Sequence, residues 1–167
     1  MHYIALFVLL TASVLADNAP QYYSFSPAVG SGSGSAYSLT GEGRITAVRV
    51  WEAYNNYIYG FQFRYGFIWS AVVGFRSGTP QEMELYEGEA IIQISGKYAH
   101  YVQWVVFTTN RGRMMVVGQP TGHSFNMYPA HKEAELRFIS GRVHGAITSI
   151  GAHWAVVHPA ANSTTEH

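Results

Sequence analysis

The segment Gly43-Arg-Ile-Thr-Ala-Val48 is echoed later in the chain by Gly145-Ala-Ile-Thr-Ser-Ile150, and Ile94-Ser-Gly-Lys97 is echoed by Ile139-Ser-Gly-Arg142. A unit that cannot bury its own apolar face packs against copies of itself, so internal recurrence indicates a fold built from repeated units. Chance recurrence of a few common residue types is the alternative. The repeat therefore has to agree with the strand pattern of the whole chain.

Short apolar and aromatic runs, separated by glycine-bearing turns, dominate that pattern. Tyr, Phe, Trp, Val and Ile are the residues that strands favour. Within several runs the side chains alternate, as where Phe61 and Phe63 flank Gln62, which predicts one buried and one solvated face. About a dozen strands are expected, at 21–26, 36–39, 45–51, 57–65, 68–73, 82–86, 90–95, 101–109, 113–117, 124–128, 135–139 and 146–157.

Helices are not expected, because no long window keeps a helical period with caps and glycines interrupt the chain at short intervals. The fold class is therefore all-β. The segment Val29-Gly-Ser-Gly-Ser-Gly-Ser35 has the composition of a flexible linker. Only a short stretch of mature chain precedes it, so we favour a loop between two strands.

The N-terminal residues 1–16 have the pattern of a secretory signal peptide. An apolar core over 4–10 is followed by small residues, with Val14 and Ala16 preceding the cut, and the segment is too short to span a bilayer. We expect one domain over 17–159 and a polar tail over 160–167, which carries a glycosylation sequon at Asn162. The expected location is secreted and extracellular.

Charge and cysteine content exclude several classes of function. Ten basic residues balance ten acidic ones, so binding to nucleic acid is not expected. The chain has no cysteine and must be held together by packing alone. We expect neither a metal nor another cofactor, because the spacing of the histidines is not that of zinc ligands. The histidines considered are His100, His123, His131, His144, His153 and His158.

A series of motifs in fixed order covers nearly all of the expected mature chain. They are the Gly-Ser-Gly loop at 30–35, Gly43 to Val50, Arg64-Tyr-Gly66 with Trp69, Gly88-Glu89, Ile91 to Tyr98, Val106 to Gly112, Gly122 with Ser124-Phe125, and Leu136 to Arg142 leading to Ile150 to Trp154. In this order and spacing they resemble the jacalin-related lectins, and among them the animal zymogen-granule lectins.

The resemblance implies a β-prism I fold of three four-stranded Greek-key sheets with pseudo-threefold symmetry, which agrees with the internal recurrences and the number of expected strands. It also implies a non-enzymatic, metal-independent, secreted carbohydrate-binding protein. The glycans expected are extended ones, such as mannose-type glycans or bacterial cell-wall polysaccharide. Storage in secretory granules and binding to granule-membrane or mucosal glycoproteins are implied in the same way.

The family binds sugar at one end of the prism, between a Gly-rich loop, a recognition loop and a loop before the last strand. Glycines let backbone amides approach a sugar closely, and aromatic edges pack on its ring. The resemblance assigns ligand binding to Gly32, Ser33, Gly34 and Ser35, to Lys97, Tyr98, His100 and Tyr101, and to Gly151, Ala152, His153, Trp154 and Ala155.

The sequence departs from the family pattern at two places. The last loop of the family ends in an aspartate that accepts two sugar hydroxyls, and here we expect Ala155 at that position. Asp17 is the only aspartate of the chain, so no nearby aspartate replaces it. In the Gly-rich loop, Ser35 and Ala36 stand where zymogen-granule lectins tend to carry basic residues. We therefore expect weakened binding of simple mannose and of sulfated polysaccharide.

Two groups of residues have a structural interpretation beside the functional one. Trp51, Trp69 and Trp104 are expected in the core rather than stacked on sugars, while for Trp154, beside the binding loop, both alternatives stay open. His153 is expected to be a hydrogen-bonded or partly exposed strand residue. The glutamates at 82, 84, 87 and 89 surround a turn and are expected at the solvated surface, although a carboxylate pair is also the signature of a glycosidase. An enzyme is not expected.

The competing hypothesis is a degenerate lectin scaffold that binds protein or granule-membrane partners. A patch of basic side chains would serve it, formed by Arg44, Arg49, Arg64, Arg111, Arg113, Arg137 and Arg142.

Overall fold

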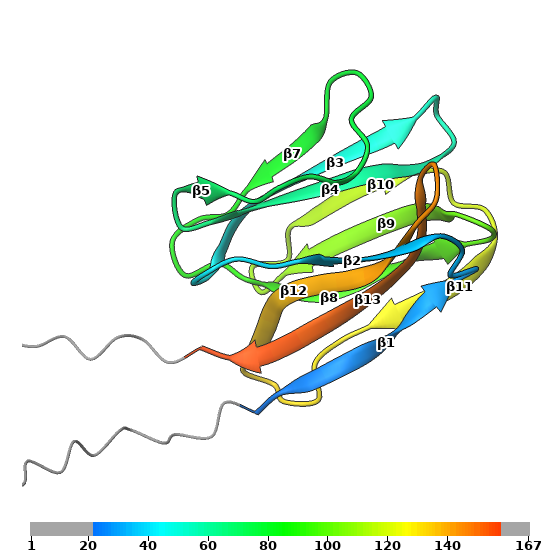
Figure 1. Ribbon diagram of the computed structural model, residues 1–167. Helices are drawn as coiled ribbons and strands as arrows, with labels where there is room; N and C mark the ends of the chain where they lie inside the picture. The colour runs from blue at the N-terminus through cyan, green and yellow to red at the C-terminus, as the bar shows by residue number, and fades with distance from the viewer. Residues whose placement is uncertain (1–21, 158–167) are drawn as a thin grey trace, which may run out of the picture.

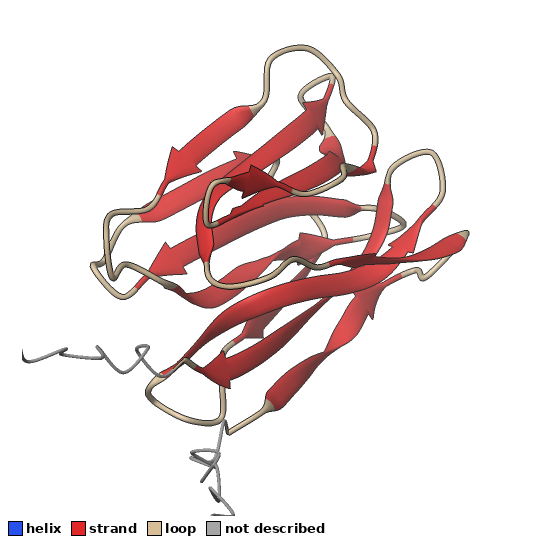
Figure 2. Ribbon diagram, turned by 60° about the vertical axis from the view of Figure 1, so that its left-hand side comes forward, coloured by secondary structure: helices blue, strands red, loops and turns tan. Residues whose placement is uncertain are grey.

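The computed structural model describes residues 22–157. The expected signal peptide at 1–16, the start of the mature chain at Asp17, the tail at 160–167 and the sequon at Asn162 all lie outside the described residues. Within them the chain forms thirteen strands and no helix, so the all-β prediction is confirmed (Figure 2).

Three antiparallel sheets enclose a common core (Figure 1). Sheet A has the order β1 (Ser24–Gly30), β13 (Ile147–Val156), β12 (Ala134–Val143) and β2 (Ser35–Leu39). Sheet C has the order β10 (Met114–Gly118), β9 (Val102–Thr109), β8 (Ile91–Tyr98) and β11 (His123–Met127). In sheet B, β7 (Gln81–Glu84), β3 (Ile45–Ala53) and β4 (Tyr57–Tyr65) are completed by the short strands β5 (Ile68–Trp69) and β6 (Val73–Gly74), which both pair with β4.

Sheets B and C are Greek keys, because strands joined by hairpins are followed by one that returns beside the first, and sheet A has the same strand order. In sheet A this unit is made by both ends of the chain, which places β1 beside β13. The expected strand at 68–73 is two strands instead. The expected strand at 21–26 extends to Gly30, so that the Gly-rich loop begins one residue later.

The core lies where the inner faces of the sheets meet. Phe107 of sheet C contacts Phe61 and Phe63 of sheet B edge to face, with centroid distances of 6.1 and 6.0 Å. All three rings are fully buried. Trp51 is buried, as predicted, and Trp154, for which both alternatives were open, is buried too. The core prediction is wrong for Trp69 and Trp104, which are half-buried. Alternation in the strands thus supplies one contiguous core for all three sheets.

The two sequence recurrences differ in structural meaning. Ile94 and Ile139 each lie five residues before the turn that ends β8 and β12, so this recurrence reflects the symmetry of the fold. Gly43 precedes β3, which runs toward the 54–56 turn, whereas Gly145 lies in a turn from which β13 runs away. Tyr57 contacts Tyr101, and Tyr101 lies beside Gly145, so both turns are at the same end of the prism. The recurrence of Gly43-Arg-Ile-Thr is therefore not a structural repeat.

Candidate functional site

One end of the prism, called the loop end below, gathers the turns at 31–34, 54–56, 99–101, 119–122 and 144–146. The opposite end, called the terminal end, is where β1 begins and β13 ends (Figure 1). The Gly-rich loop, residues 31–34, joins the two edge strands of sheet A at the loop end, next to the β12–β13 turn.

Two hydrogen bonds, both involving Thr148, hold the Gly-rich loop against β13. The Gly32 N–H donates to the Thr148 carbonyl at 3.4 Å, and the Thr148 hydroxyl donates to the Ser33 carbonyl at 2.6 Å. Thr148 is fully buried beneath the loop. The loop is thus held in one conformation before any ligand arrives, which lowers the ordering cost of binding.

Glycine is required at both ends of this loop. Gly30 and Gly34 have φ values of 126° and 90°, and a Cβ on either would collide with a backbone carbonyl oxygen, of Thr148 or Val143 respectively. Arg142 adds a further attachment, because its Nε and Nη2 both donate to the Gly34 carbonyl, at 3.1 and 2.6 Å. The Gly-Ser composition of 30–35 therefore reflects close backbone approach rather than a linker.

The recognition turn of sheet C lies against the Gly-rich loop, as the sequence predicts. The Ser31 hydroxyl donates to the His100 carbonyl at 2.7 Å. The Tyr101 ring packs edge to face on His100, with 4.7 Å between centroids, and lies 4.3 Å from the ring of Tyr57 in sheet B. Three sheets thus contribute to one surface of backbone groups, hydroxyls and aromatic edges.

Lys97 and Tyr98 belong to the same hairpin but lie within β8, before the turn. Lys97 is opposite Trp104 and Ser124 in the register of sheet C, and is half-buried. The Tyr98 ring contacts His123 at 5.6 Å. Both residues therefore lie within sheet C, before the recognition turn.

The loop that the resemblance implies at 150–155 is wrong, because these residues continue β13, which confirms the strand predicted over 146–157 from the residue pattern. Trp154 and Ala155 are buried, and the Trp154 Nε1 donates to the Ser26 hydroxyl at 3.1 Å. Gly151 is a packing glycine: a Cβ there would lie 3.0 Å from the Ser26 carbonyl oxygen on β1. Strand propensity and this close packing of β1 keep the segment extended.

Ala155 also lies at the wrong end of the strand. It pairs with Glu135 near the terminal end, whereas Gly30 pairs with Ser149 at the start of β13. Six residues of strand separate Ala155 from Ser149, which is roughly 20 Å. Ala155 is therefore not the residue that faces the Gly-rich loop; Thr148 is. No other aspartate stands there, because the only one, Asp17, precedes the described residues.

His153 is the hydrogen-bonded strand residue that we expected. Its Nε2 lies 2.8 Å from the Ser140 hydroxyl, and its ring stacks on Phe138 with 4.0 Å between centroids. Burial lowers the pKa of His153 below its ordinary value. The ring faces a groove of about 280 Å³ on the outer face of sheet A, which Tyr23 and Phe25 also line. Gly151 and Ala152 have no exposed side chain beside it.

Sequence reasoning missed four residues that build the loop end: Ser31, Tyr57, Arg142 and Thr148. Thr148 stood in the recurrent segment, but its contact with the Gly-rich loop depends on how β13 pairs with β1. Arg142 was assigned only to a hypothetical basic patch. These four residues share one sequence feature that could have identified them: each is a polar residue next to a turn or to a glycine that the backbone requires.

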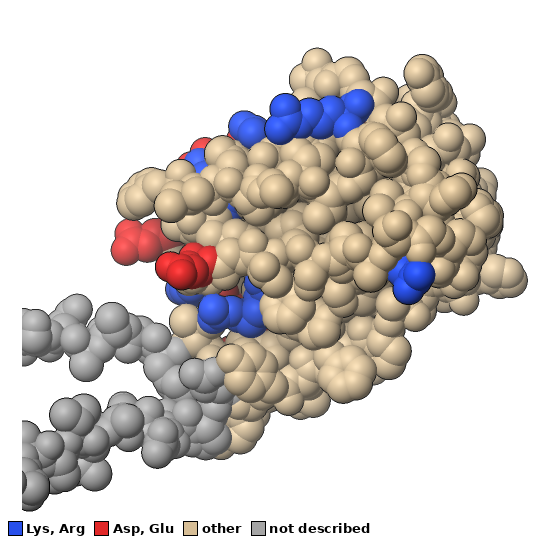
Figure 3. Space-filling view, in the orientation of Figure 1, with Lys and Arg blue, Asp and Glu red and all other residues tan. Residues whose placement is uncertain are grey.

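The basic side chains do not form one patch. Arg142 lies at the loop end, whereas Arg44, Arg64 and Arg113 pair with Glu135, Glu84 and Glu89 respectively. Arg49 pairs with Glu82 on sheet B and lies 3.7 Å above the Trp69 ring. In the view of Figure 3 the acidic side chains lie toward the terminal end. The seven arginines therefore do not form one shared basic surface, and four of them are paired with glutamates.

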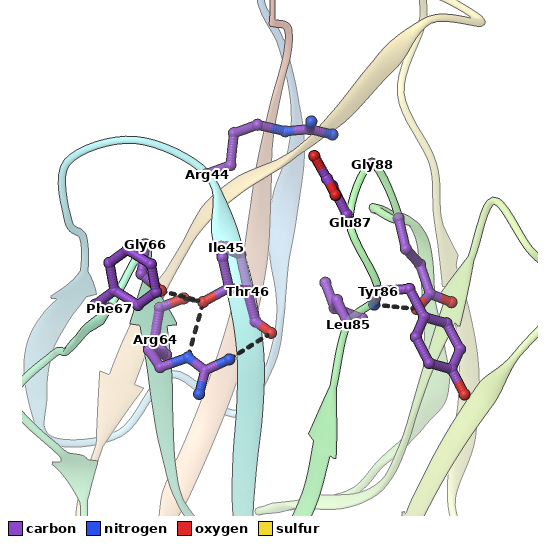
Figure 4. A pocket seen from close by; sticks show the side chains of 11 residues that line it. Arg44, Ile45, Thr46, Arg64, Gly66, Phe67, Leu85, Tyr86, Glu87 and Gly88 are labelled. Carbon is purple, nitrogen blue, oxygen red and sulfur yellow. Dashed lines mark hydrogen bonds between the residues drawn. The ribbon is translucent and has the colours of Figure 1, made fainter.

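A cavity of about 310 Å³ lies at the terminal end, far from the Gly-rich loop. Its floor includes Ile45 and Leu85, and Figure 4 shows Arg44 and Glu87 pointing toward one another across it. Arg64 is held by the Thr46 hydroxyl at 2.9 Å and by Glu84 at 2.9 Å. The two arginines that line this cavity, Arg44 and Arg64, are therefore both paired with glutamates of the protein.

Glu89 contradicts the expectation of a solvated acidic turn, although Glu82, Glu84 and Glu87 are exposed. It is 3% exposed, and it accepts hydrogen bonds from the Thr109 hydroxyl, the Tyr86 backbone amide and Arg113. Burial alone would raise the pKa of Glu89, but these hydrogen bonds and the guanidinium charge outweigh it and hold the pKa below its ordinary value. Glu89 is therefore a structural anchor of the terminal end.

Comparison with known proteins agrees with this architecture. The Jacalin-like lectin domain model matches residues 26–153. The chain is 45% identical over 158 residues to human zymogen granule membrane protein 16, covering 92% of this chain and 93% of that protein.

Solved structures show the same likeness. A prostate-specific WGA16 glycoprotein lectin is 32% identical, with a TM-score of 0.71 over 81% of this chain and 100% of that one. The mannose-binding lectin from Champedak shares the fold at 18% identity, with a TM-score of 0.69 over 83% of this chain and 99% of that one. These neighbours are β-prism lectins, proteins that bind carbohydrate without converting it. The chain belongs to the jacalin-like lectin family.

Proposed function

We propose that this protein binds extended glycans, of mannose type or from bacterial cell walls, at the loop end of the prism. The observation that carries the proposal is the joining of the Gly-rich loop to two other elements by side chains: Ser31 to His100, and Thr148 to Ser33. A preset loop of glycine amides beside tyrosine edges suits a ligand that offers many hydroxyls and an apolar ring face.

Simple mannose is expected to bind weakly. No aspartate is available in the described residues, and Thr148 uses its hydroxyl to hold the loop. A hydrogen bond to a charged group contributes about 1.5 to 3 kcal/mol, so a missing carboxylate weakens a hexose roughly tenfold or more. A longer glycan regains affinity by contacting more of the loop end.

The test is binding of the mature protein to an array of mannose-type glycans and bacterial polysaccharides, with two matched tyrosine variants. Tyr101→Ala removes a ring of the proposed site, and Tyr128→Ala removes an exposed ring at the terminal end. We expect binding that competing oligosaccharide elutes and that only Tyr101→Ala weakens, by tenfold or more. Absence of binding to every glycan, or equal losses in the two variants, would overturn the proposal.

A second candidate function is binding of a protein partner by the outer face of sheet A. The groove there is lined by Tyr23, Phe25, Phe138 and His153, and Phe25 is 69% exposed. Exposed aromatic side chains are typical of interaction surfaces. In this case Phe25→Ser abolishes capture of the partner, and salt or detergent, not oligosaccharide, releases it.

The proposed setting is the secretory pathway, with storage in granules. Its supports are the signal-peptide pattern of residues 1–16 and the likeness to proteins named for the zymogen granule membrane. Within 22–157, no helix is long and apolar enough to cross a membrane. N-terminal sequencing of the exported protein tests entry into the secretory pathway. We expect cleavage after Ala16.

A further inference from the structure

Histidines gather at the loop end. Of the five histidines between 22 and 157, three lie in or beside its turns and are exposed, namely His100, His123 and His144. The other two each use a ring nitrogen in a hydrogen bond, His131 with the Glu133 backbone amide and His153 with the Ser140 hydroxyl. Within the described part of the chain, the three rings at the loop end form no such bond, so their nitrogens can meet a ligand.

All three rings adjoin the recognition turn of sheet C. His100 lies within this turn, and its ring packs edge to face on Tyr101 at 4.7 Å. His144 lies in the β12–β13 turn, which approaches the Tyr101 hydroxyl. His123 begins β11, and its ring centroid lies 5.6 Å from that of Tyr98, the last residue of β8. The histidines of three separate segments therefore lie around one turn.

Two of these histidines also border the Gly-rich loop, at its opposite ends. The Ser31 hydroxyl donates to the His100 carbonyl at 2.7 Å. At the other end, a Cβ on Gly34 would lie only 2.6 Å from the Cβ of His144. Protonation of both rings therefore adds a positive charge beside each end of the loop that the proposed glycan contacts.

The groups packed around the three rings include few fixed charges. Lys97 of β8 pairs with Ser124, the neighbour of His123 in β11, and Arg142 donates to the Gly34 carbonyl. The Glu52 carboxylate accepts a hydrogen bond from the Gln119 amide at 2.7 Å. The Gly-rich loop contributes only serine hydroxyls. The titratable groups around the histidines are thus Glu52, Tyr57, Lys97, Tyr98, Tyr101 and Arg142.

Histidine is the side chain that gains a positive charge as the pH falls from about 8 to about 5. Acidification therefore adds as many as three positive charges at the loop end, while the acidic side chains in Figure 3 lie toward the terminal end. A cluster of cationic groups attracts anionic ligands and speeds their association.

We infer that His100, His123 and His144 make the loop end a pH-dependent site, which binds acidic glycans in acidic surroundings and releases them near neutral pH. The direction follows from the charge: the protonated rings attract carboxylate or sulfate groups, and deprotonation removes that attraction. This inference rests on the proposed function, because it concerns the regulation of the same surface.

The test is calorimetric titration of the mature protein at about pH 5.5 and about pH 7.5, on both sides of the histidine range. The probes are hyaluronan oligosaccharides, dextran sulfate and neutral mannan. An exposed ion pair changes affinity by at most about fivefold, so three histidines give roughly a tenfold gain for the acidic probes at the lower pH. Mannan shows no comparable gain, and high salt removes the gain because it screens exposed charges.

Dextran sulfate separates titration of the protein from titration of the glycan, because its sulfate groups stay ionised at both pH values. The gain is lost when all three histidines are changed, in the variant His100→Gln, His123→Gln, His144→Gln. The matched control is His131→Gln at the terminal end, which keeps the gain. His144→Lys fixes one charge and raises the affinity for dextran sulfate at neutral pH by a few-fold, and thermal unfolding at both pH values shows that each variant is folded.

The outcomes separate the inference from the proposed function. Equal affinity for the acidic probes at the two pH values, with mannan still bound, overturns the inference and leaves the proposed function standing. A gain that survives in the triple variant, or that His131→Gln removes equally, overturns the inference as well. If the triple variant does not fold, an unchanged neutral affinity in His144→Lys overturns it. Absence of binding to every probe at both pH values overturns both claims.

Discussion

Thr148 and Ser33 lie 115 positions apart in the sequence and are joined by a 2.6 Å hydrogen bond from the threonine hydroxyl to the serine carbonyl. This bond holds the middle of the Gly-rich loop against β13. Because Thr148 is fully buried, its role is to set the loop conformation rather than to contact a ligand directly.

Thr148→Val keeps the shape of the side chain and removes the hydroxyl. The Ser33 carbonyl then loses its partner, at a cost of about 1 to 3 kcal/mol. We expect the loop to gain mobility and glycan affinity to fall several-fold, measured by calorimetric titration and by hydrogen exchange of the Gly32 amide. The control is Thr108→Val, on β9 away from the loop. Equal effects of the two variants would contradict a specific role of Thr148.

Ala155→Asp is expected to destabilise the fold without creating sugar binding. The side chain is 2% exposed and lies opposite Glu135, so the variant buries a second carboxylate beside the first. A buried unpaired charge costs about 3 to 5 kcal/mol. Chemical denaturation measures the loss, and a glycan array measures binding. Mannose binding gained by a stable variant would contradict this placement of Ala155.

Glu89→Gln is expected to lower the free energy of unfolding by about 1.5 to 3 kcal/mol, because the partly exposed Arg113 loses the charge that pairs with it. The matched control is Glu87→Gln, since Glu87 is exposed in the same turn and should change stability by less than about 0.5 kcal/mol. Urea unfolding at neutral pH measures both. Similar values for the two variants would mean that burial of Glu89 is not stabilising.

The lowered pKa of Glu89 also predicts the direction of the acid response. A carboxyl with a lower pKa in the folded state binds fewer protons than in the unfolded state, so stability falls as the pH drops below the unfolded value of about 4.3 and through the folded pKa. Unfolding curves over this acid range should show a steeper loss for the native protein than for Glu89→Gln. Parallel curves would count against the pairing.

Gly30→Ala tests the close approach between the loop and β13. The new Cβ meets the Thr148 carbonyl oxygen at a φ of 126°, and we expect a loss above about 3 kcal/mol. Gly112→Ala is the control, since Gly112 has a φ of 74° but no neighbouring atom, and only the backbone strain of about 1 to 2 kcal/mol remains. Thermal unfolding distinguishes them, and a loss at Gly30 no larger than at Gly112 would contradict the collision.

His153 gives a separate pH dependence near neutrality. Burial lowers its pKa, so the unfolded state binds more protons and stability falls as the pH drops below the unfolded value of about 6.5. We expect His153→Phe, which can keep the stacking on Phe138, to flatten this part of the stability curve. His144→Gln, at an exposed turn, should not. An unchanged slope in His153→Phe would show that this ring does not contribute.

The local pattern of the sequence was sufficient for the fold class. Alternation such as Phe61-Gln62-Phe63 marks strands because successive side chains of a strand face opposite sides of a sheet. The recurrence of Ile94-Ser-Gly-Lys97 as Ile139-Ser-Gly-Arg142 reflects the symmetry of the fold. The two segments lie at the same distance before equivalent turns of sheets C and A.

The site depended on information that local patterns do not hold. The run from Ile147 to Val156 gives no sign of where a turn would fall, so the resemblance placed its loop at Ala155 although the chain stays extended. Only the pairing of β1 with β13 shows that Thr148 faces the Gly-rich loop. The sequence by itself determined an all-β, cysteine-free chain without an aspartate after Asp17. The tertiary structure decided which residues meet at the loop end, because such contacts arise between distant segments whose register is set by the packing of whole sheets.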